Sequence, residues 1–237
     1  GCVRRGATVA MIDGGDGAFR AARANAGLVF SQCKGVGMPA YAAWTRECID
    51  LWPDFAEEMS GAAGRDIGFR QTGGMTFCVG AQELETRRRA LSQAEQQPGG
   101  ASTPIMMVDR RELQDLMPRA PFGPEVCGGS YTPRDAQLNP LLLLRGLHAG
   151  FRARGGQHHP GRTVSAIAPQ GEGYRVTTEA EALDARRVVI AAGIATQALA
   201  ASVGMHVPVV PTRGQAVITE RIEPILPMGC SGVRQTM

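Results

Sequence analysis

An acidic residue closes a short apolar run near the start of the chain, and it is the first feature that could do chemistry. The run is residues 8–12 (TVAMI), followed directly by Asp13, Gly14 and Gly15. Such a run predicts a buried strand. In a dinucleotide-binding unit, an acid at the end of the second strand hydrogen-bonds an adenosine ribose. Asp13 is therefore a candidate nucleotide-binding residue, with an ordinary acid in a turn as the alternative.

The glycine fingerprint that belongs to such a unit does not precede Asp13. In a complete unit, G-x-G-x-x-G follows the first strand and opens a helix whose N-terminus holds the pyrophosphate. Residues 1–6 instead resemble the last turn of a helix closed by Gly6, and the sequence does not begin with Met. We therefore expect the first strand and the phosphate loop to lie outside this chain, which should bind a dinucleotide weakly by itself.

Helical and strand patterns alternate along the rest of the chain. Apolar periodicity predicts helices over 41–59 and 81–97. An Asp-x-x-Glu capping box predicts a third helix over 109–118. Asn139 and Pro140 are suited to begin a fourth helix, which ends before Gly155. Pro53 predicts a kink or two abutting helices. Strands are predicted within 66–79, 125–133, 162–169, 173–179, 185–193 and 207–217. The continuous apolar run in 185–193 is typical of a parallel strand buried on both faces.

Composition excludes several classes of protein. The 237 residues carry a net charge of +3, and acidic and basic residues are mixed, so we expect no nucleic-acid surface. The basic run 87–89 is interpreted as a solvated helix face, and His158 and His159 as an exposed turn. The six cysteines form no C-x-x-C motif, so we expect no metal site and reduced thiols in a cytoplasmic protein. No apolar run approaches the ~20 residues needed to span a bilayer.

The segment GDGAFRAARANAGLV (residues 15–29) resembles the FAD-dependent D-amino-acid oxidase superfamily. Four later segments occur in the order that the family shows: 69–75 (FRQTGGM), 134–140 (RDAQLNP), 162–167 with 188–193 (RTVSAI, VVIAAG), and 211–215 (PTRGQ). The resemblance implies an α/β fold, in which a Rossmann-like FAD-binding domain is interleaved with an α+β substrate domain. The FAD-binding domain would comprise 1–64 and 134–206, and the substrate domain 65–133 and 207–237.

The resemblance also implies roles for individual residues. Asp13 would bind the adenosine ribose, and Val164 would meet the adenine through its backbone. The pyrophosphate and the isoalloxazine would be lined by Arg23, Asn25, Ala26 and Gly27. The backbone would pass close to the cofactor at Ala192 and Gly193, and the flavin's reactive region would be approached by Arg213, Gly214 and Gln215. A surface ion pair is the alternative for Arg213, and no catalytic residue is assigned.

The implied reaction is oxidation of the C–N bond of a small amino acid: a D-amino acid, glycine or an N-alkyl glycine. Hydride passes from Cα to flavin N5, and water hydrolyses the resulting imine to an oxo acid and an amine. The electron acceptor stays open and is either oxygen or a quinone or other carrier. Three further contacts also stay open: one with another subunit, a peripheral one with the inner membrane, and homo-oligomerisation. The alternative is a catalytically inactive remnant that binds a partner. A disulfide-reductase type of flavoprotein is disfavoured because C-x-x-C is absent.

Overall fold

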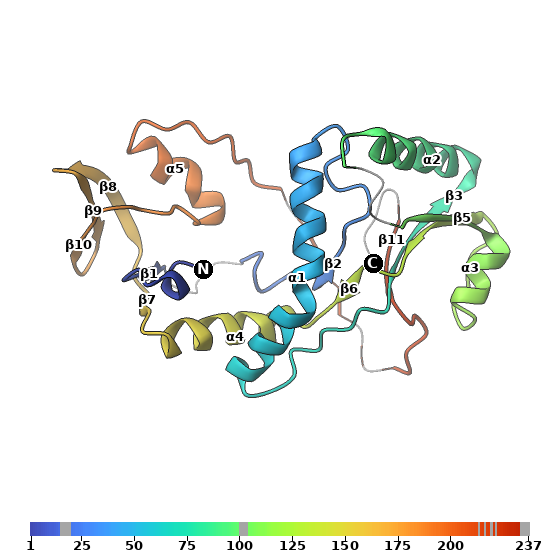
Figure 1. Ribbon diagram of the computed structural model, residues 1–237, viewed down its shortest axis with the longest axis horizontal. Helices are drawn as coiled ribbons and strands as arrows, with labels where there is room; N and C mark the ends of the chain where they lie inside the picture. Colours follow the sequence, from blue (N-terminus) through green and yellow to red (C-terminus); the bar gives the residue numbers. More distant parts are fainter. Residues whose placement is uncertain are drawn as a thin grey trace. The chain divides into compact units, whose positions relative to one another are not determined.

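The computed structural model describes residues 1–14, 20–99, 104–212, 214–215, 217–218, 220 and 222–232. The chain divides into two compact units (Figure 1). Unit 1 comprises Gly1–Arg20 and Gly150–Val217, and unit 2 comprises Ala21–Ala149 and Ile218–Met237. These two units are defined by compactness. The four segments expected from the sequence (1–64, 65–133, 134–206 and 207–237) were defined by the roles of the family's domains, and that division stays a prediction.

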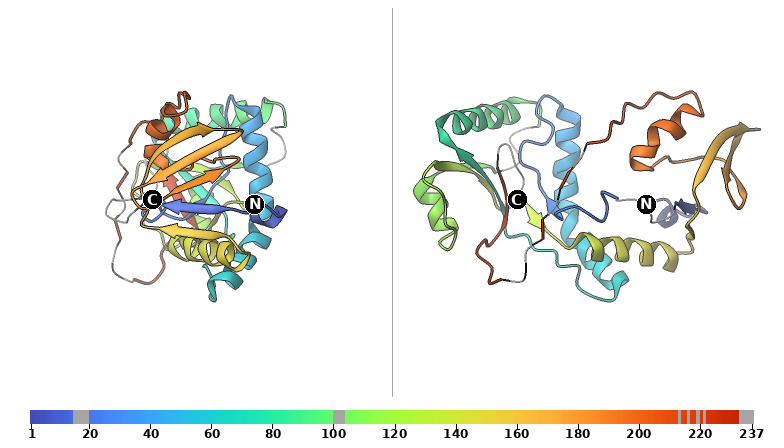
Figure 2. Two further views of the ribbon diagram at one scale, coloured as in Figure 1. Left: turned by 90° about the vertical axis from the view of Figure 1, so that its left-hand side faces the viewer. Right: turned by 180° about the vertical axis from the view of Figure 1, so that it is seen from behind.

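Unit 1 is built around short strands. Its elements in chain order are η1 (Val3–Arg5), β1 (Ala10–Asp13), β7 (Gln157–Pro160), β8 (Val164–Gln170), β9 (Gly173–Thr178), β10 (Ala182–Ala185), η3 (Gly193–Ala195) and α5 (Thr196–Ala201). Strand β1 pairs in parallel with β7, and β10-β9-β8 form an antiparallel sheet, as the left view of Figure 2 shows. Gly6 closes η1 with a φ of 79°, which confirms the predicted helix end.

The expectation of an exposed turn at His158 and His159 is wrong, because these residues lie in strand β7, which pairs with β1. His158 and His159 pair with Met11 and Ile12 in β7, and both side chains are partly buried. His159 Nδ1 lies 3.2 Å from Glu181 Oε1. The sequence around the histidines is typical of a turn, but the backbone N–H and C=O groups of β1 need hydrogen-bond partners. A distant segment, 157–160, supplies them by forming a strand.

Two other predicted strands are absent from the described residues. Residues 186–192 lie outside any strand, and Val189 is 81% exposed. The described residues of 207–217 are likewise not in a strand, and Val217 is 90% exposed. An apolar run forms a strand only where a neighbouring strand and covering helices are available, and no described strand pairs with either segment.

Unit 2 contains a four-stranded sheet and most of the helices. Its elements are β2 (Leu28–Val29), α1 (Pro39–Ala63), β3 (Gly74–Val79), α2 (Gly80–Gln96), β4 (Met106–Asp109), α3 (Arg110–Leu116), β5 (Val126–Thr132), β6 (Ala136–Gln137), β11 (Gly229–Gly232) and α4 (Pro140–Ala153), which begins in this unit. The sheet order is β11-β3-β5-β4, and β2 pairs separately with β6. The capping box of α3 and the Asn139 cap of α4 form as predicted.

Helix α1 runs through Pro53 as one helix, so the expectation of two abutting helices is wrong. Buried residues lie on both sides of the proline, with Ile49 before it and Ala56 and Met59 after it. Apolar packing along the whole length outweighs the single backbone hydrogen bond that a proline removes.

The two faces of the four-stranded sheet differ in chemistry. Met75 and Phe77 of β3 belong to a hydrophobic core with Leu113 and Met117 from the region of α3. The alternate residue Thr76 and its neighbour Ser130 lie on the other face, beneath α2, and are also buried. The sheet of unit 2 is therefore closed by an apolar layer on one side and by a polar layer on the other.

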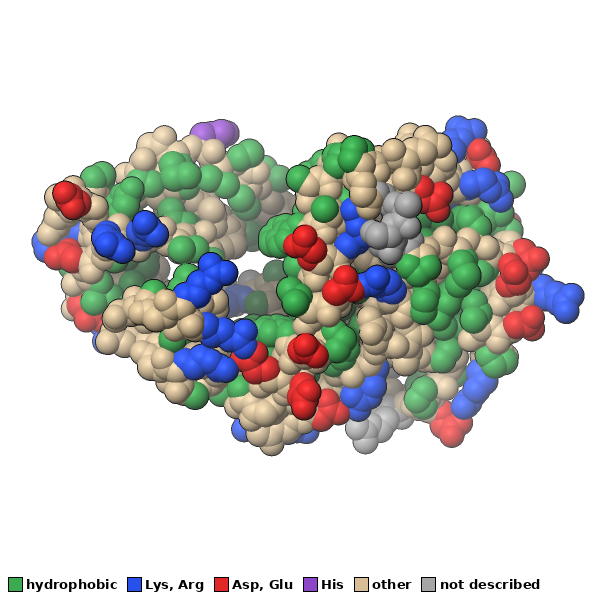
Figure 3. Space-filling view, viewed as in Figure 1, with side chains coloured by type: hydrophobic (Ala, Val, Ile, Leu, Met, Phe, Trp, Pro, Cys, Tyr) green, Lys and Arg blue, Asp and Glu red, His purple; other side chains and the backbone are tan. Residues whose placement is uncertain are grey.

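The outer surface carries both signs of charge. On the face seen in Figure 3, acidic and basic side chains are interspersed over the part of unit 2 that holds α2 and α3. Among the described residues, no helix combines the length and the apolar character that crossing a bilayer requires.

Candidate functional site

In unit 1, the structure brings Asp13 close to the start of β8. Asp13 is the last residue of β1, and its backbone oxygen accepts a hydrogen bond from Arg162 N at 2.9 Å. Val164 opens β8 two residues later. A Cβ at Gly14 would lie 3.4 Å from Thr163 Oγ1, so the two segments are in close contact. The acid thus lies at the carboxyl end of a parallel strand, as predicted, beside the strand that contains Val164.

The carboxylate of Asp13 has a cationic partner within unit 1. Arg20 donates to Asp13 Oδ1 through Nη1 and to the oxygen of Gly14 through Nη2, at 2.6 Å for the second bond. The side chains of Arg20 and Asp13 remain 30% and 34% exposed. Because an ionised carboxylate has about four acceptor positions, Asp13 has capacity for donors in addition to Arg20.

The other predicted cofactor residues of unit 1 are on its surface. Ala192 and Gly193 are exposed, and Gly193 begins η3 with a φ of 58°. Gly214 and Gln215 are exposed and lie outside helices and strands. Arg213 lies outside the described residues. A Cβ added at Gly193 or Gly214 would meet no described atom within 4 Å, so the backbone at both glycines is accessible.

The segment Arg23–Gly27 belongs to unit 2, and Asn25 shapes it. Asn25 Nδ2 donates to the oxygens of Ala21 and Ala22 at 3.1 and 3.2 Å, and its Oδ1 accepts from Gly27 N at 2.9 Å. Arg23, Asn25 and Ala26 are exposed. The side chain of Asn25 therefore closes a turn, which is a common use of asparagine.

Gly27 is required by packing within unit 2. Its φ is 70°, and a Cβ there would lie 2.0 Å from the backbone oxygen of Leu138. The backbone oxygen of Gly27 accepts from Leu138 N at 2.9 Å. The resemblance assigns Gly27 a cofactor role, and the structure adds a reason for glycine that is independent of any ligand.

A buried polar cluster of unit 2 was not predicted from the sequence. At its centre the Gln32 amide group makes four hydrogen bonds. Its Nε2 donates to Asp135 Oδ2 at 3.0 Å and to the oxygen of Gly74 at 2.8 Å. Its Oε1 accepts from Arg87 Nη2 and Ser130 Oγ, both at 2.8 Å. We call Ser31, Gln32, Arg87, Ser130 and Asp135 the Gln32 cluster.

Asp135 is the buried anion of the Gln32 cluster, with an exposure of 0%. Its Oδ1 accepts from Ser31 N at 2.7 Å and from Ser31 Oγ at 2.9 Å. Burial raises the pKa of Asp135 above its ordinary value, although hydrogen bonds from Ser31 and Gln32 and the charge of Arg87 act in the opposite direction. Burial likewise raises the pKa of the Cys33 thiol, with Arg87 opposing it.

Arg87 corrects the interpretation of the basic run. Arg88 and Arg89 pair with Glu85 and are 57% and 72% exposed, which confirms a solvated face for these two. Arg87 instead reaches the polar face of the sheet, where its Nε donates to Ser130 Oγ at 2.7 Å and its Nη2 also to Thr76 Oγ1 at 3.2 Å. The sequence signal that could have revealed this buried polar face is the alternation of polar residues in 74–78 and 128–132. By itself, however, such alternation is more typical of a strand with one side facing solvent.

The comparisons with known proteins decide the family. The chain matches the family described as FAD dependent oxidoreductase (DAO) over residues 2–234. The chain belongs to the DAO family. It is 34% identical to an opine oxidase subunit of Agrobacterium tumefaciens (strain Ach5) over 235 residues, which cover 99% of this chain and 63% of the relative. It is 30% identical to hydrogen cyanide synthase subunit HcnC of Pseudomonas aeruginosa over 196 residues, covering 81% of this chain and 45% of the relative.

Solved structures show the DAO fold. The crystal structure of glycine oxidase from Geobacillus kaustophilus aligns with a TM-score of 0.81 and 21% identity, covering 98% of this chain and 61% of that chain. L-proline dehydrogenase from P. horikoshii aligns with a TM-score of 0.74 and 18% identity, covering 98% and 60%. The expected α/β fold with a Rossmann-like FAD-binding domain is thereby confirmed, and FAD is the cofactor of the family. The chain spans less than two thirds of the length of these relatives.

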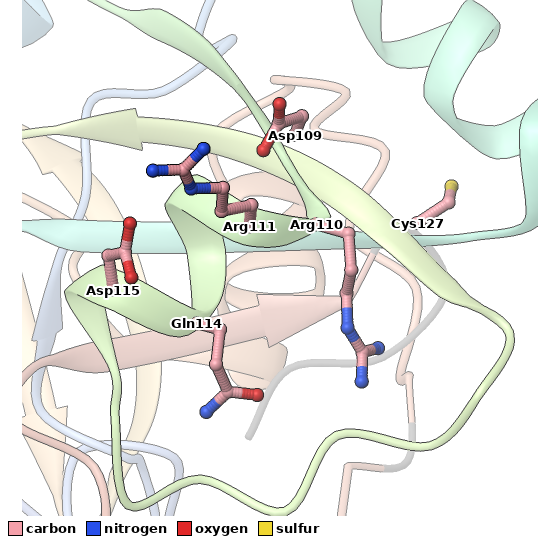
Figure 4. Close-up of a pocket in the computed structure, with 6 residues that line it drawn as sticks. All are labelled: Asp109, Arg110, Arg111, Gln114, Asp115 and Cys127. Atoms are coloured by element: carbon pink, nitrogen blue, oxygen red, sulfur yellow. The ribbon is translucent and has the colours of Figure 1, made fainter.

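A hollow beside α3 is explained by local packing. Figure 4 shows it lined by Asp109, Arg110, Arg111, Gln114, Asp115 and Cys127. Arg110 donates to the backbone oxygens of Gly123, Val126 and Phe122, and Cys127 to those of Cys78 and Gly80. These groups hold the loop before β5 in place, so the hollow needs no ligand to account for its polar lining.

The cysteines are protein thiols without a partner cysteine. All six are free, and burial raises the pKa of Cys78 and of Cys230 to about 11. Both thiols therefore stay protonated at neutral pH, and neither is a reactive thiolate. Among the described residues, no group of three His, Cys, Asp or Glu side chains is arranged to hold a metal ion.

Proposed function

We propose that this chain is part of a flavoenzyme that oxidises the carbon–nitrogen bond of an N-substituted amino acid. The family match over 2–234 supports flavin-dependent oxidation. Two relatives support a substituted nitrogen: the opine oxidase subunit, at 34% identity, and human dimethylglycine dehydrogenase, at 23% identity over 180 residues. An opine is an amino acid that carries a carboxyalkyl group on its nitrogen. Of the class expected from the sequence, the N-alkyl glycines agree with this proposal, and N-carboxyalkyl amino acids are added to it.

The residues that the resemblance assigns to FAD keep these roles in the proposal. Asp13 would bind the ribose, Val164 would meet the adenine, and Ala192 and Gly193 would allow a close approach of the backbone. The pyrophosphate and the ring system would be bordered by Arg23, Asn25, Ala26 and Gly27, and the reactive region of the flavin by Arg213, Gly214 and Gln215. When bound, FAD supplies the hydride acceptor for C–N bond oxidation.

The observation that carries the FAD-binding part of the proposal is the position of Asp13. An acid ends a strand of a parallel pair, its backbone bonds to Arg162, and Val164 opens the adjacent strand. This is the arrangement in which a carboxylate receives ribose hydroxyl groups beyond the carboxyl ends of parallel strands. The carboxylate of Asp13 is also partly exposed, so a ribose can reach it beside Arg20.

Asp13→Asn should weaken FAD binding about 10-fold or more, because a hydrogen bond to a charged group contributes about 1.5–3 kcal/mol. The measurement is quenching of FAD fluorescence on titration with the purified chain. Asp184→Asn is the matched control, since Asp184 lies in the same unit and is paired with Arg175 at 2.8 Å in the same way that Asp13 is paired with Arg20. We expect Asp184→Asn to bind FAD like the unmodified chain.

Equal FAD affinity of Asp13→Asn and Asp184→Asn would remove the ribose-binding role of Asp13. Absence of FAD binding by all three proteins would favour the alternative of an inactive, partner-binding module. The unmodified chain is expected to bind FAD weakly, so the titration needs chain concentrations that reach the micromolar to millimolar range.

The substrate class is tested by flavin reduction in the full-length enzyme. Under anaerobic conditions, an N-carboxyalkyl amino acid should bleach the flavin absorbance at least about ten times faster than glycine or D-alanine. The expected products are an oxo acid and a primary amino acid, formed when water hydrolyses the imine. Faster reduction by glycine would instead place the enzyme with the unsubstituted members of the class expected from the sequence.

The names of two relatives support a contact with a second subunit. The opine oxidase relative and HcnC are, by their names, subunits of enzymes. We infer that the full-length protein contacts a second subunit, works in the cytoplasm or at the inner membrane surface, and passes electrons to oxygen or to a quinone or other carrier.

A further inference from the structure

We propose that Arg87 and Gln32 are positioning residues for the segment 23–33. Acting through Asp135, they fix the end of this segment and thereby the placement of Arg23–Gly27, which borders FAD if the proposed function holds. The flavin consequence rests on the proposed function, whereas the mechanical role of the Gln32 cluster stands on contacts within unit 2.

The first step of the argument is the shortness of the ladder that carries the segment. Strands β2 and β6 share only two residue pairs, Leu28 with Gln137 and Val29 with Ala136. A ladder of this length is not stable by itself. It is extended at one end by Leu138 N donating to the oxygen of Gly27, and at the other by Ser31 donating to Asp135. The proposed flavin segment and the Gln32 cluster therefore lie at opposite ends of one ladder.

The second step is the direction of the hydrogen bonds at Gln32. Both acceptor positions of its Oε1 face donors, from Arg87 and Ser130, and both protons of its Nε2 face acceptors, on Asp135 and Gly74. A reversed amide would place donors against Arg87 and an acceptor against a carboxylate. Arg87 and Asp135 together therefore leave Gln32 a single orientation.

The third step is the cost of this cluster. The opposite face of the same sheet is closed by apolar side chains at no such cost. Burying Asp135 and part of Arg87 removes water from both charged groups, and hydrophobic side chains at these positions would avoid this cost. Some proteins retain buried polar networks because the network allows only one arrangement of the groups in it. The next residue, Cys33, has a φ of 56°, a left-handed conformation that a non-glycine residue adopts only when its surroundings impose it. A backbone held in this way is what a positioning role requires.

The test compares Arg87→Met with Arg88→Met in the purified 237-residue chain. The readout is amide hydrogen exchange followed by mass spectrometry, with β4 (106–109) and α3 (110–116) of the same unit as internal references. We expect exchange in peptides covering 23–38 to accelerate at least about 10-fold in Arg87→Met, while the two reference segments exchange as in Arg88→Met. Arg87→Lys, which keeps the charge but not the forked donor, should give an intermediate rate.

A merely structural role of Arg87 predicts a different pattern. Loss of global stability would accelerate exchange in 23–38, β4 and α3 together, and an unimportant Arg87 would leave all of them unchanged. Either pattern overturns the proposal. If Arg87→Met does not fold, Arg87→Lys decides by the same criterion: hydrogen exchange must be faster in 23–38 and unchanged in β4 and α3.

Alkylation of cysteines gives a second measurement on the same proteins. Cys33 adjoins Gln32, whereas Cys78 and Cys230 are buried in β3 and β11. We expect N-ethylmaleimide to modify Cys33 at least about 3-fold faster in Arg87→Lys than in the unmodified chain, with unchanged rates at Cys78 and Cys230, because lysine keeps the positive charge that lowers the pKa of Cys33 and Cys78. A parallel rise at all three thiols would contradict the proposal.

Titration with FAD separates this proposal from the proposed function. Arg87→Met should bind FAD at least about 10-fold more weakly than Arg88→Met and the unmodified chain. Equal binding by Arg87→Met and Arg88→Met overturns the positioning of the flavin segment. Absence of binding by every protein contradicts the proposed function instead, and hydrogen exchange then still decides whether the Gln32 cluster positions the segment.

Discussion

Gly27→Ala is expected to lower the free energy of unfolding of unit 2 by about 2–5 kcal/mol, the sum of about 1–2 kcal/mol for a left-handed alanine and about 1–3 kcal/mol for overpacking. The new Cβ would lie 2.0 Å from the oxygen of Leu138, and this atom belongs to the backbone and cannot rotate away. The hydrogen bond from Leu138 N to the oxygen of Gly27 would be lost as the two segments separate. Urea unfolding followed by tryptophan fluorescence measures the effect, because Trp44 and Trp52 both lie in α1 of unit 2.

Gly64→Ala is the matched control for this substitution. Gly64 ends α1 with a φ of 69°, against 70° at Gly27, but no described atom lies within 4 Å of its added Cβ. It should therefore cost only the conformational part, about 1–2 kcal/mol. A Gly27→Ala protein that is no less stable than Gly64→Ala would show that the contact with Leu138 imposes no constraint.

Asp135→Asn should destabilise unit 2 by about 3 kcal/mol, because charge-assisted hydrogen bonds are lost and a donor is placed against a donor. The new amide group at position 135 would accept from Ser31 through its oxygen, but its nitrogen would face Gln32 Nε2. Gln32 cannot reverse to receive it, since Arg87 and Ser130 hold Oε1. Asp66→Asn is the control, because Asp66 and Arg70 are 59% and 58% exposed and an exposed ion pair contributes little to stability.

The same geometry predicts that a second substitution rescues the first. Gln32→Glu alone should also destabilise unit 2, because a second carboxylate would face Asp135. In Gln32→Glu with Asp135→Asn, the new carboxylate at position 32 would accept from Arg87 and from the new amide at position 135. This restores the order of donors and acceptors except at Gly74. We expect the double variant to recover about half or more of the summed loss, in a double-mutant cycle measured by urea unfolding. Additive losses would falsify the directional network.

Local features of this protein could be predicted from its sequence because they depend on residues within one or two turns. The capping box between Asp109 and Glu112 and the cap of Asn139 on Leu141 and Leu142 involve neighbours at most three residues apart. The acid-tipped strand β1 also forms as predicted. These contacts need no knowledge of the remainder of the fold.

The local setting of two candidate site residues was predictable to a similar degree. The residue pattern placed Asp13 at the end of a strand and Val164 within another predicted strand (162–169), and the structure brings these segments into contact. The Gln32 cluster was not predictable, because its members are up to 104 residues apart and each has an ordinary local explanation. Arg87 in particular has the same sequence environment as Arg88, and only the sheet beneath α2 distinguishes them.

Residue order alone was enough to establish the family, the local helix and turn signals and the acid that ends β1. Tertiary structure was needed to establish which strand pairs with β1, which arginine of α2 turns inward, and why Gly27 must be glycine. The difference arises because hydrophobic periodicity and capping are short-range properties, whereas burial depends on which distant segment arrives to cover a residue. His158 became a strand residue because β1 required a partner, and Val189 stayed exposed because no described strand pairs with its segment.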